Sequence, residues 1–315
     1  MGEAARALFD AYVMVDWSAR STRATGADSI WWALVERLNG RPRLVRRENP
    51  PYRAEATETL GEVLCGLADA GRRVLVGFDF PFGYPRGFAR RLGLDAGAAA
   101  PAWRAIWELL ANRVEDGPYN ENNRFTLAAE LNGPGDFPFW GHPHQWCFDG
   151  LKPTKPRRYG DDTLPERRYV ELRVPRTKPL WQLTGNGSVG SQALLGIPRV
   201  RELRLHPDLA DRTVIWPFET GLDVPRVEAG VVVLAEVYPS LVRERRERRQ
   251  VKDACQVRTV AELFAALDAR EALAPLFAGD PGLDPVVRRC VETEEAWILG
   301  VTDRAPGFDA DTAHA

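Results

Sequence analysis

Residues 73–80 read RVLVGFDF, and this stretch decides the fold of the chain. The run is almost continuously apolar, which is typical of a strand buried on both faces of a parallel sheet. It ends in Asp79 and is followed by the strand breaker Pro81. Residues 11–17 (AYVMVDW) and 231–238 (VVVLAEVY) repeat the pattern, carrying Asp16 and Glu236 near their ends. The sequence therefore predicts three buried strands that each present a carboxylate.

The segments around these runs predict an α/β fold with one mixed sheet. Residues 29–35 and 43–46 read as two further strands, and the short turns before them favour antiparallel pairing. Residues 54–70 have apolar positions at helical spacing, which suits a crossover to a parallel strand. We expect five strands with helices on both faces. Further helical patterns cover residues 101–112, 121–131, 188–196, 240–268 and 284–301.

The middle third of the chain differs in composition from its flanks. Residues 84–228 are rich in Pro, Gly, Trp and Asn and show little strand periodicity, which predicts a long insertion of helices and loops. We expect a core made of residues 1–83 and 229–303, with the insertion as a subdomain or an elaborated cap. The charged residues 304–315 are expected to form a disordered tail.

Charge and composition narrow the classes of function. Lys and Arg number 42 against 44 Asp and Glu, a net charge of -2 that does not favour a general nucleic-acid binder. No run approaches the length of a membrane span, and the N-terminus does not resemble a secretory signal, so we expect no membrane association. The four cysteines form no CxxC pair, which disfavours a zinc knuckle. Reduced thiols in the cytoplasm are expected, with Cys65 and Cys290 buried on apolar helical stripes.

The strand-end acids are the first candidate site. Ligands of open α/β sheets bind beyond the carboxyl ends of the strands, so Asp16, Asp79 and Glu236 converge there if their strands are neighbours. Clustered carboxylates repel one another unless a cation neutralises them, and oxygen ligands select Mg²⁺ or Mn²⁺. In the alternative interpretation each acid ends its strand because Asp is a favoured turn residue.

The helical pattern over residues 284–301 adds two acids. Its apolar stripe places Glu294 at the centre and Glu295 at the flank. A glutamate that faces a core is costly unless it is paired or binds a metal. If the helix is rotated, both acids are solvated instead.

Three other segments carry polar groups that suit a ligand. Residues 185–190 (GNGSVG) open a helical pattern, so Ser188, Ser191 and Gln192 could face an anion, or the turn could simply pack. No clear strand precedes this turn, which disfavours a dinucleotide site. Lys252 and Asp253 could form a polar pair near the acids or belong to a solvated helix face. The basic run over residues 241–252 has the same two interpretations, and GHPHQWC (residues 141–147) is interpreted as a loop rather than a zinc site.

At this point the chain resembles the ribonuclease-H-like superfold, and more narrowly a bacterial family of unknown function described as predicted ribonuclease-H-like nucleases. The resemblance rests on VDWSA around Asp16, FDFPFGYP around Asp79 and EVYPS around Glu236, and it covers residues 10–90 and 230–301. It implies two-metal phosphodiester cleavage, with Asp16, Asp79 and Glu294 or Glu295 as ligands and Glu236 as a fourth. The chain departs from the pattern in EEAWILG (residues 294–300), where many relatives place aspartates.

The resulting expectation is a Mg²⁺- or Mn²⁺-dependent nuclease or phosphodiesterase acting on nucleic acid or a nucleotide-like phosphate ligand. Arg167 and Arg168 and the turn carrying Ser188 and Gln192 would shape its substrate site. One alternative is a small-molecule or phosphate-ligand enzyme or binder on the same fold, because fold does not fix function. Another is a non-catalytic partner-binding protein whose acids are structural. A serine hydrolase elbow and a Walker motif are absent from the sequence.

Overall fold

The computed structural model describes residues 7–38, 40–94, 100–160, 162–175, 177–185, 187–242 and 250–303. The tail expected over residues 304–315, and residues 243–249 of the basic run, lie outside the described residues. Within the described part of the chain, no helix is both long and apolar enough to span a bilayer.

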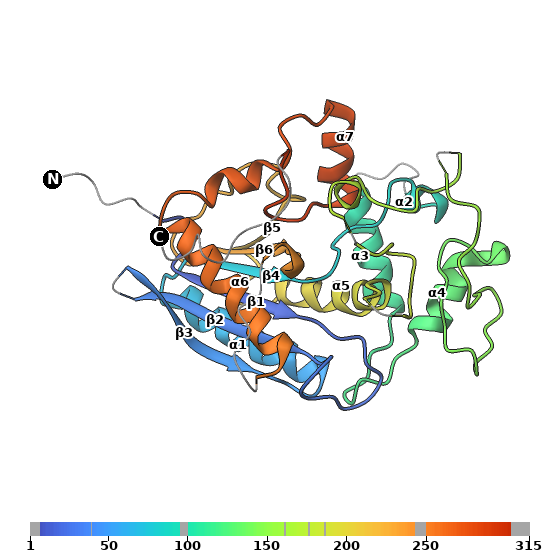
Figure 1. Cartoon of the computed structure of the whole chain (residues 1–315), viewed down its shortest axis with the longest axis horizontal. Helices are drawn as coiled ribbons and strands as arrows, with labels where there is room; N and C mark the ends of the chain where they lie inside the picture. Colours follow the sequence, from blue (N-terminus) through green and yellow to red (C-terminus); the bar gives the residue numbers. More distant parts are fainter. Residues whose placement is uncertain are drawn as a thin grey trace.

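Six strands of the described chain form one mixed sheet in the order β3-β2-β1-β4-β6-β5 (Figure 1). The first three strands pair antiparallel, and β1, β4, β6 and β5 are parallel to one another. The strands are β1 Ala11–Asp16, β2 Trp31–Leu38, β3 Arg41–Glu48, β4 Val74–Phe78, β5 Thr213–Ile215 and β6 Val232–Glu236. The prediction of a mixed sheet is confirmed, but the count of five strands is wrong. The extra strand, β5, has three residues and is too short for a periodic signal.

Two separate cores cover the two faces of the sheet. On β1, Val13 and Val15 belong to one core and Tyr12 and Met14 to the other, as the alternation of side chains along a strand requires. Helices α1 (Arg53–Asp69) and α5 (Gly190–Arg204) pack into the first core, and α6 (Lys252–Asp268) packs into the second. Figure 1 shows α6 crossing one face of the sheet and α1 on the other. The expectation of helices on both faces is confirmed.

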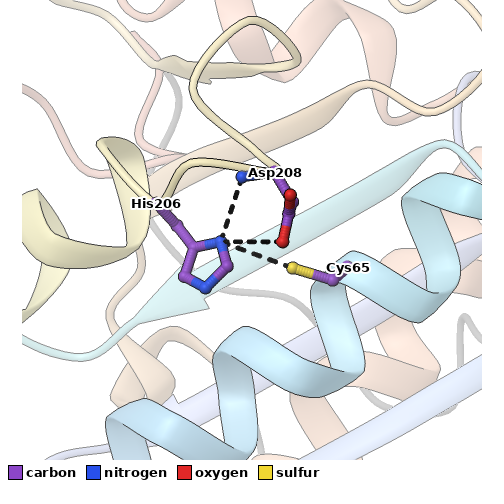
Figure 2. Close-up of side chains that lie close together, drawn as sticks. All are labelled: Cys65, His206 and Asp208. Carbon is purple, nitrogen blue, oxygen red and sulfur yellow. Dashed lines mark hydrogen bonds and ion pairs between the residues drawn. The ribbon is translucent and has the colours of Figure 1, made fainter.

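Helix α5 runs well beyond the expected residue 196, to Arg204, with Pro198 inside it. The turn that follows α5 brings the chain back to α1, where Cys65, His206 and Asp208 lie close together (Figure 2). Both ends of the predicted helix over 54–70 agree with α1 to within one residue.

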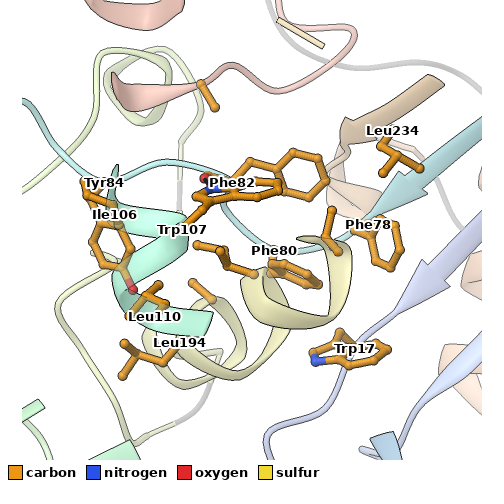
Figure 3. Close-up of a cluster of buried hydrophobic side chains, with 14 of the residues drawn as sticks. Trp17, Phe78, Phe80, Phe82, Tyr84, Ile106, Trp107, Leu110, Leu194 and Leu234 are labelled. Carbon is orange, nitrogen blue, oxygen red and sulfur yellow. Dashed lines mark hydrogen bonds between the residues drawn. The ribbon is translucent and has the colours of Figure 1, made fainter. Parts of the chain in front are cut away.

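The middle segment packs directly against the end of β4. Besides α5, its α-helices are α2 (Phe88–Arg91), α3 (Ala102–Arg113) and α4 (Arg124–Asn132). Phe78, Phe80 and Phe82 contact one another, and Trp107 of α3 packs edge-on against Phe82 and donates an indole hydrogen bond of 2.8 Å to its carbonyl oxygen (Figure 3). Aromatic packing from residues 84–228 therefore fixes the segment that carries Asp79.

The last helical segment is shorter than the sequence predicts. Helix α7 covers Pro285–Cys290 and continues as a wide turn, η5, over Val291–Glu295. Ala296 then adopts a left-handed φ of 63°, and Ile298 forms a parallel bridge with Glu236 of β6. The helix expected up to residue 301 is wrong because the chain instead joins the sheet. Single-turn helices are η1 Gly133–Gly135, η2 Val170–Leu172, η3 Pro239–Leu241 and η4 Ala274–Ala278.

Two glycines test how tightly the aromatic cluster is packed. A Cβ atom at Gly196 of α5 would lie 2.4 Å from the ring of Phe80, whereas a Cβ at Gly66 of α1 meets nothing within 4 Å. We expect Gly196→Ala to lower the free energy of unfolding by about 1–3 kcal/mol through overpacking. Gly66→Ala should raise it by about 0.5–1 kcal/mol through helix propensity. Urea unfolding of both variants measures this, and equal effects would contradict the packing described.

Candidate active site

A cavity of about 280 Å³ lies at the end of the sheet where β1, β4 and β6 terminate. Asp16, Asp79 and Glu236 all contribute to its lining, so the structure brings the three strand-end acids to one place. Three basic residues, Arg168, Lys178 and Lys252, line the same cavity.

Asp16 and Asp79 form a side-by-side pair. Val15 of β1 is in register with Phe78 of β4, so the next residue of each strand lies on the same face of the sheet, the one covered by α6. The two carboxyl groups lie close enough for each to affect the ionisation of the other, and Asp79 accepts a hydrogen bond of 2.7 Å from the backbone N–H of Trp17. Such a pair must share a proton or hold a cation, because two adjacent carboxylates repel.

Burial and like charge make the pair hard to ionise. Burial is the main cause that raises the pKa of Asp79, to about 7. Burial and the charge of Asp79 raise the pKa of Asp16 well above its ordinary value. The nearby carboxylate of Asp253 raises both pKa values further, and Lys252 opposes it at Asp16.

Asp253 is a third acid whose charge acts on the pair, although it is outside the cavity lining. It stands in the first turn of α6, and its carboxylate accepts a hydrogen bond of 2.7 Å from the backbone N–H of Asp28. The sequence grouped Asp253 with Lys252 as substrate-binding residues. The structure places Lys252 in the cavity lining and the charge of Asp253 close to Asp16 and Asp79.

Glu236 faces a different set of partners. It is in register with Phe78 rather than with Asp79, so its side chain lies on the opposite face of the sheet from the acid pair. Its two carboxylate oxygens accept hydrogen bonds of 2.6 and 2.8 Å from the buried guanidinium of Arg168, and one of them accepts a third from Phe82 N–H. Burial raises the pKa of Glu236, and Arg168 opposes that rise.

Arg168 is the hub of this region. Besides Glu236, its guanidinium donates to the carboxylate of Glu171 (2.9 Å) and to the backbone oxygen of Glu295 (2.9 Å). The two carboxylates raise the pKa of Arg168 against the opposing effect of burial. One side chain from the middle segment thus joins β6 to the C-terminal segment, and most of its donors are used within the protein.

Glu294 and Glu295 are outside the cavity lining. Glu294 accepts hydrogen bonds from the backbone N–H groups of Gly87 (2.9 Å) and Ala89 (3.3 Å) at the start of α2. Glu295 is fully buried and accepts from the backbone N–H groups of Arg86 (2.8 Å) and Tyr169 (2.6 Å). Burial raises the pKa of Glu295 to about 7. Both acids fasten the C-terminal segment to neighbouring loops.

The remaining expected residues divide between the cavity and the scaffold. Gln192 lines the cavity and donates a hydrogen bond to the backbone oxygen of Trp17. Ser191 is buried and donates to the backbone oxygen of Leu183, while Arg167 donates to Thr177. Ser188 is outside the cavity lining.

Sequence reasoning missed several lining residues. Thr177 and Lys178 come from a loop with no periodic pattern, and Gln256 lies one turn beyond Lys252 on α6. Ser240 was visible in the EVYPS segment but carried no assigned role. The helix position of Gln256 relative to Lys252 was the one available signal, because residues four apart share a helix face.

Cysteine burial differs from the expectation. Cys65 and Cys290 are only partly buried, whereas Cys255 is buried and Cys147 is exposed. His142, His144 and Cys147 lie in a loop, since residues 141–147 form neither helix nor strand.

The acid pair predicts an unusual pH dependence of stability. Because the folded-state pKa of each acid lies above its unfolded value, the protonated pair stabilises the fold at low pH. This contribution is lost as the pH rises above about 4, and for Asp79 the loss extends through about 7. We expect Asp16→Asn to raise the free energy of unfolding near pH 8 in the presence of chelator, by roughly 1–3 kcal/mol. Urea unfolding across this pH range measures it.

The matched control is Asp69→Asn, which removes an acid that is 65% exposed at the end of α1. That variant should keep the pH dependence of the native chain. The free energy of unfolding should fall more steeply with rising pH in the native chain than in Asp16→Asn. Equal falls in the two chains would contradict the description of the pair.

The hub predicts a second effect on stability. Arg168→Met leaves Glu236 and Glu171 buried without their cation, so it should lower the free energy of unfolding by about 3–5 kcal/mol. The double variant Arg168→Met with Glu236→Gln should lose less, because it buries one charge fewer. Arg113→Met, which breaks an exposed pair with Glu130, should change stability by about 0.5 kcal/mol or less. A double variant less stable than the single one would contradict the assignment.

No family model, no curated protein and no solved structure matches the chain. The functional argument accordingly rests on the geometry of the acid pair and its cavity.

Proposed function

We propose that the chain is a ribonuclease-H-like, divalent-cation-dependent phosphodiesterase of the nuclease type. The observation that carries the proposal is that Asp16 and Asp79 stand side by side at the ends of two adjacent parallel strands and line one cavity. The strand order, with an antiparallel pair on one side of β1 and parallel strands on the other, supports the fold part of the proposal.

The donor set fits a hard cation. Asp16 and Asp79 offer carboxylate oxygens, with the charge of Asp253 close by, and oxygen ligands of this kind suit Mg²⁺ or Mn²⁺. Asp16 and Asp79 would hold the cation. When bound, it would neutralise charge on a phosphoryl group and lower the pKa of a water molecule.

Two lysine side chains of the cavity can contact the phosphate. Lys178 and Lys252 line the cavity and are exposed, so their ammonium groups can approach a phosphoryl oxygen. We assign Arg168 and Glu236 a positioning role, because they form a buried ion pair in which each neutralises the charge of the other. Glu294 and Glu295 likewise have a positioning role, because their carboxylates accept hydrogen bonds from backbone N–H groups of neighbouring loops.

The size of the cavity favours a second candidate substrate. About 280 Å³ lies just below the range of about 300–1,000 Å³ typical of small-molecule sites. Together with the net charge of -2, this favours a small phosphate ester over a long nucleic-acid duplex. A purely structural role for the acids is less favoured, since two carboxyl groups of like charge stand side by side in the lining of a cavity.

Hydrolysis of a chromogenic phosphodiester, bis(p-nitrophenyl) phosphate, tests the proposal with Mn²⁺ and with chelator. We expect activity that requires the cation and falls by about 100-fold or more in Asp16→Asn and in Asp79→Asn, since each loses a ligand. Asp69→Asn, which removes an exposed acid at the end of α1, should retain the native rate.

A parallel assay compares single-stranded oligonucleotides with a nucleotide-sized phosphate ester. Faster turnover of the oligonucleotide would identify a nuclease, and faster turnover of the small ester would identify the second candidate. Cation-dependent hydrolysis of neither class, or equal rates in native chain and Asp16→Asn, would refute the proposed function.

A further inference from the structure

A second group of metal-ligating side chains lies away from the acid pair, on the face of the sheet covered by α1 and α5. It consists of Cys65 in the last third of α1 and of His206 and Asp208 in the turn after α5 (Figure 2). The Sγ atom of Cys65 lies 3.6 Å from Nδ1 of His206, and Oδ2 of Asp208 lies 4.0 Å from the same nitrogen. All three ligand atoms lie within 4.8 Å of one another.

The sulfur–nitrogen distance matches a tetrahedral coordination sphere. A Zn–S bond of about 2.3 Å and a Zn–N bond of about 2.1 Å at the tetrahedral angle place sulfur and nitrogen about 3.6 Å apart. The corresponding nitrogen–oxygen separation is about 3.4 Å. The separation between Nδ1 of His206 and the Asp208 carboxylate oxygen has to shorten by roughly 0.6 Å, and the Asp208 side chain is 72% exposed and has room to move.

The backbone around His206 is already held in place. Its carbonyl oxygen accepts hydrogen bonds from the N–H groups of Leu209 (2.9 Å) and Ala210 (2.8 Å), and Leu209 is fully buried. Cys65 is fixed by α1, whose neighbouring residue Leu64 is buried in the core. Two of the three ligands therefore stand on rigid elements, which lowers the ordering cost of binding.

The site is open on one side. An open cavity of about 650 Å³ is lined by the three ligands together with Glu58 and Glu62 of α1. Water from this cavity can fill a fourth coordination position. The lining also holds Arg199, whose charge is paired with Asp116 and Glu202, so Glu58 and Glu62 leave an excess of negative charge that favours a cation.

A cysteine nucleophile is the competing interpretation of the same residues. In such a site the carboxylate would orient the ring nitrogen that is not used by the thiol. Here the thiol, the carboxylate and the N–H of Asp208 (3.3 Å) all approach Nδ1.

We propose that Cys65, His206 and Asp208 bind one zinc-class transition-metal ion that ties α1 to the connection between α5 and β5. As the bond to Sγ forms, the thiol proton leaves to solvent. Mixed sulfur, nitrogen and oxygen ligands select such an ion over Mg²⁺, so this site is chemically distinct from the acid pair.

Titration of the full chain with Co²⁺ alone, after removal of metals by a chelator, tests the proposal. We expect one equivalent to produce the near-ultraviolet absorption of a cobalt–thiolate bond. Cys65→Ser should abolish this band, and His206→Ala should weaken Co²⁺ binding by about 100-fold or more, because each loses a ligand. Asp208→Asn should weaken binding by about 10-fold, since an amide oxygen remains.

Three controls separate the outcomes. Cys147→Ser removes the exposed thiol and Asp16→Asn removes the acid pair, and both should keep the band. Zn²⁺ should raise the melting temperature of the native chain and leave that of Cys65→Ser unchanged. A native chain without the band, or a band that survives in Cys65→Ser, would overturn the proposal.

Discussion

The parallel pairing of β1 with β4 is the constraint on which the candidate active site depends. Because Val15 and Phe78 are in register, Asp16 and Asp79 must end their strands side by side on the face that α6 covers. Both strands are buried on both faces, so neither can shift by one residue without moving apolar side chains out of a core. The repulsion between the two carboxylates is thus imposed by the sheet, and it is the feature that a cation would relieve.

A second set of contacts keeps the sheet and the middle segment in one arrangement. Arg168 joins Glu236 of β6 to Glu171 and to the C-terminal segment, and Glu295 holds the backbone of Arg86 and Tyr169. On the other side, Trp107 and the phenylalanines after β4 pack into the core shared with α5. Residues 84–228 therefore shape the cavity directly, because several of its lining residues come from this segment.

The strand-end acids could be predicted from sequence because apolar runs and their breakers are local signals. Asp16, Asp79 and Glu236 were found this way, as were α1 and the antiparallel opening of the sheet. The role of Asp253 depends on where α6 crosses the sheet, and that of Glu236 depends on its register with Phe78, which no local pattern encodes. Glu294 was misplaced because a periodicity argument assumes an unbroken helix, whereas the chain turns at Ala296. Cys65 is 143 positions before Asp208 in the sequence, so no motif spacing signals the group of Cys65, His206 and Asp208.

The most direct measurement of the central claim is a calorimetric titration of the metal-free chain with Mn²⁺ near neutral pH, repeated on Asp16→Asn and on Cys65→Ser. Binding by the native chain and by Cys65→Ser, with loss of at least about 100-fold in affinity for Asp16→Asn, is the predicted result. It would establish the acid pair as the hard-cation site. Absence of Mn²⁺ binding to the native chain, or undiminished binding to Asp16→Asn, would contradict the account.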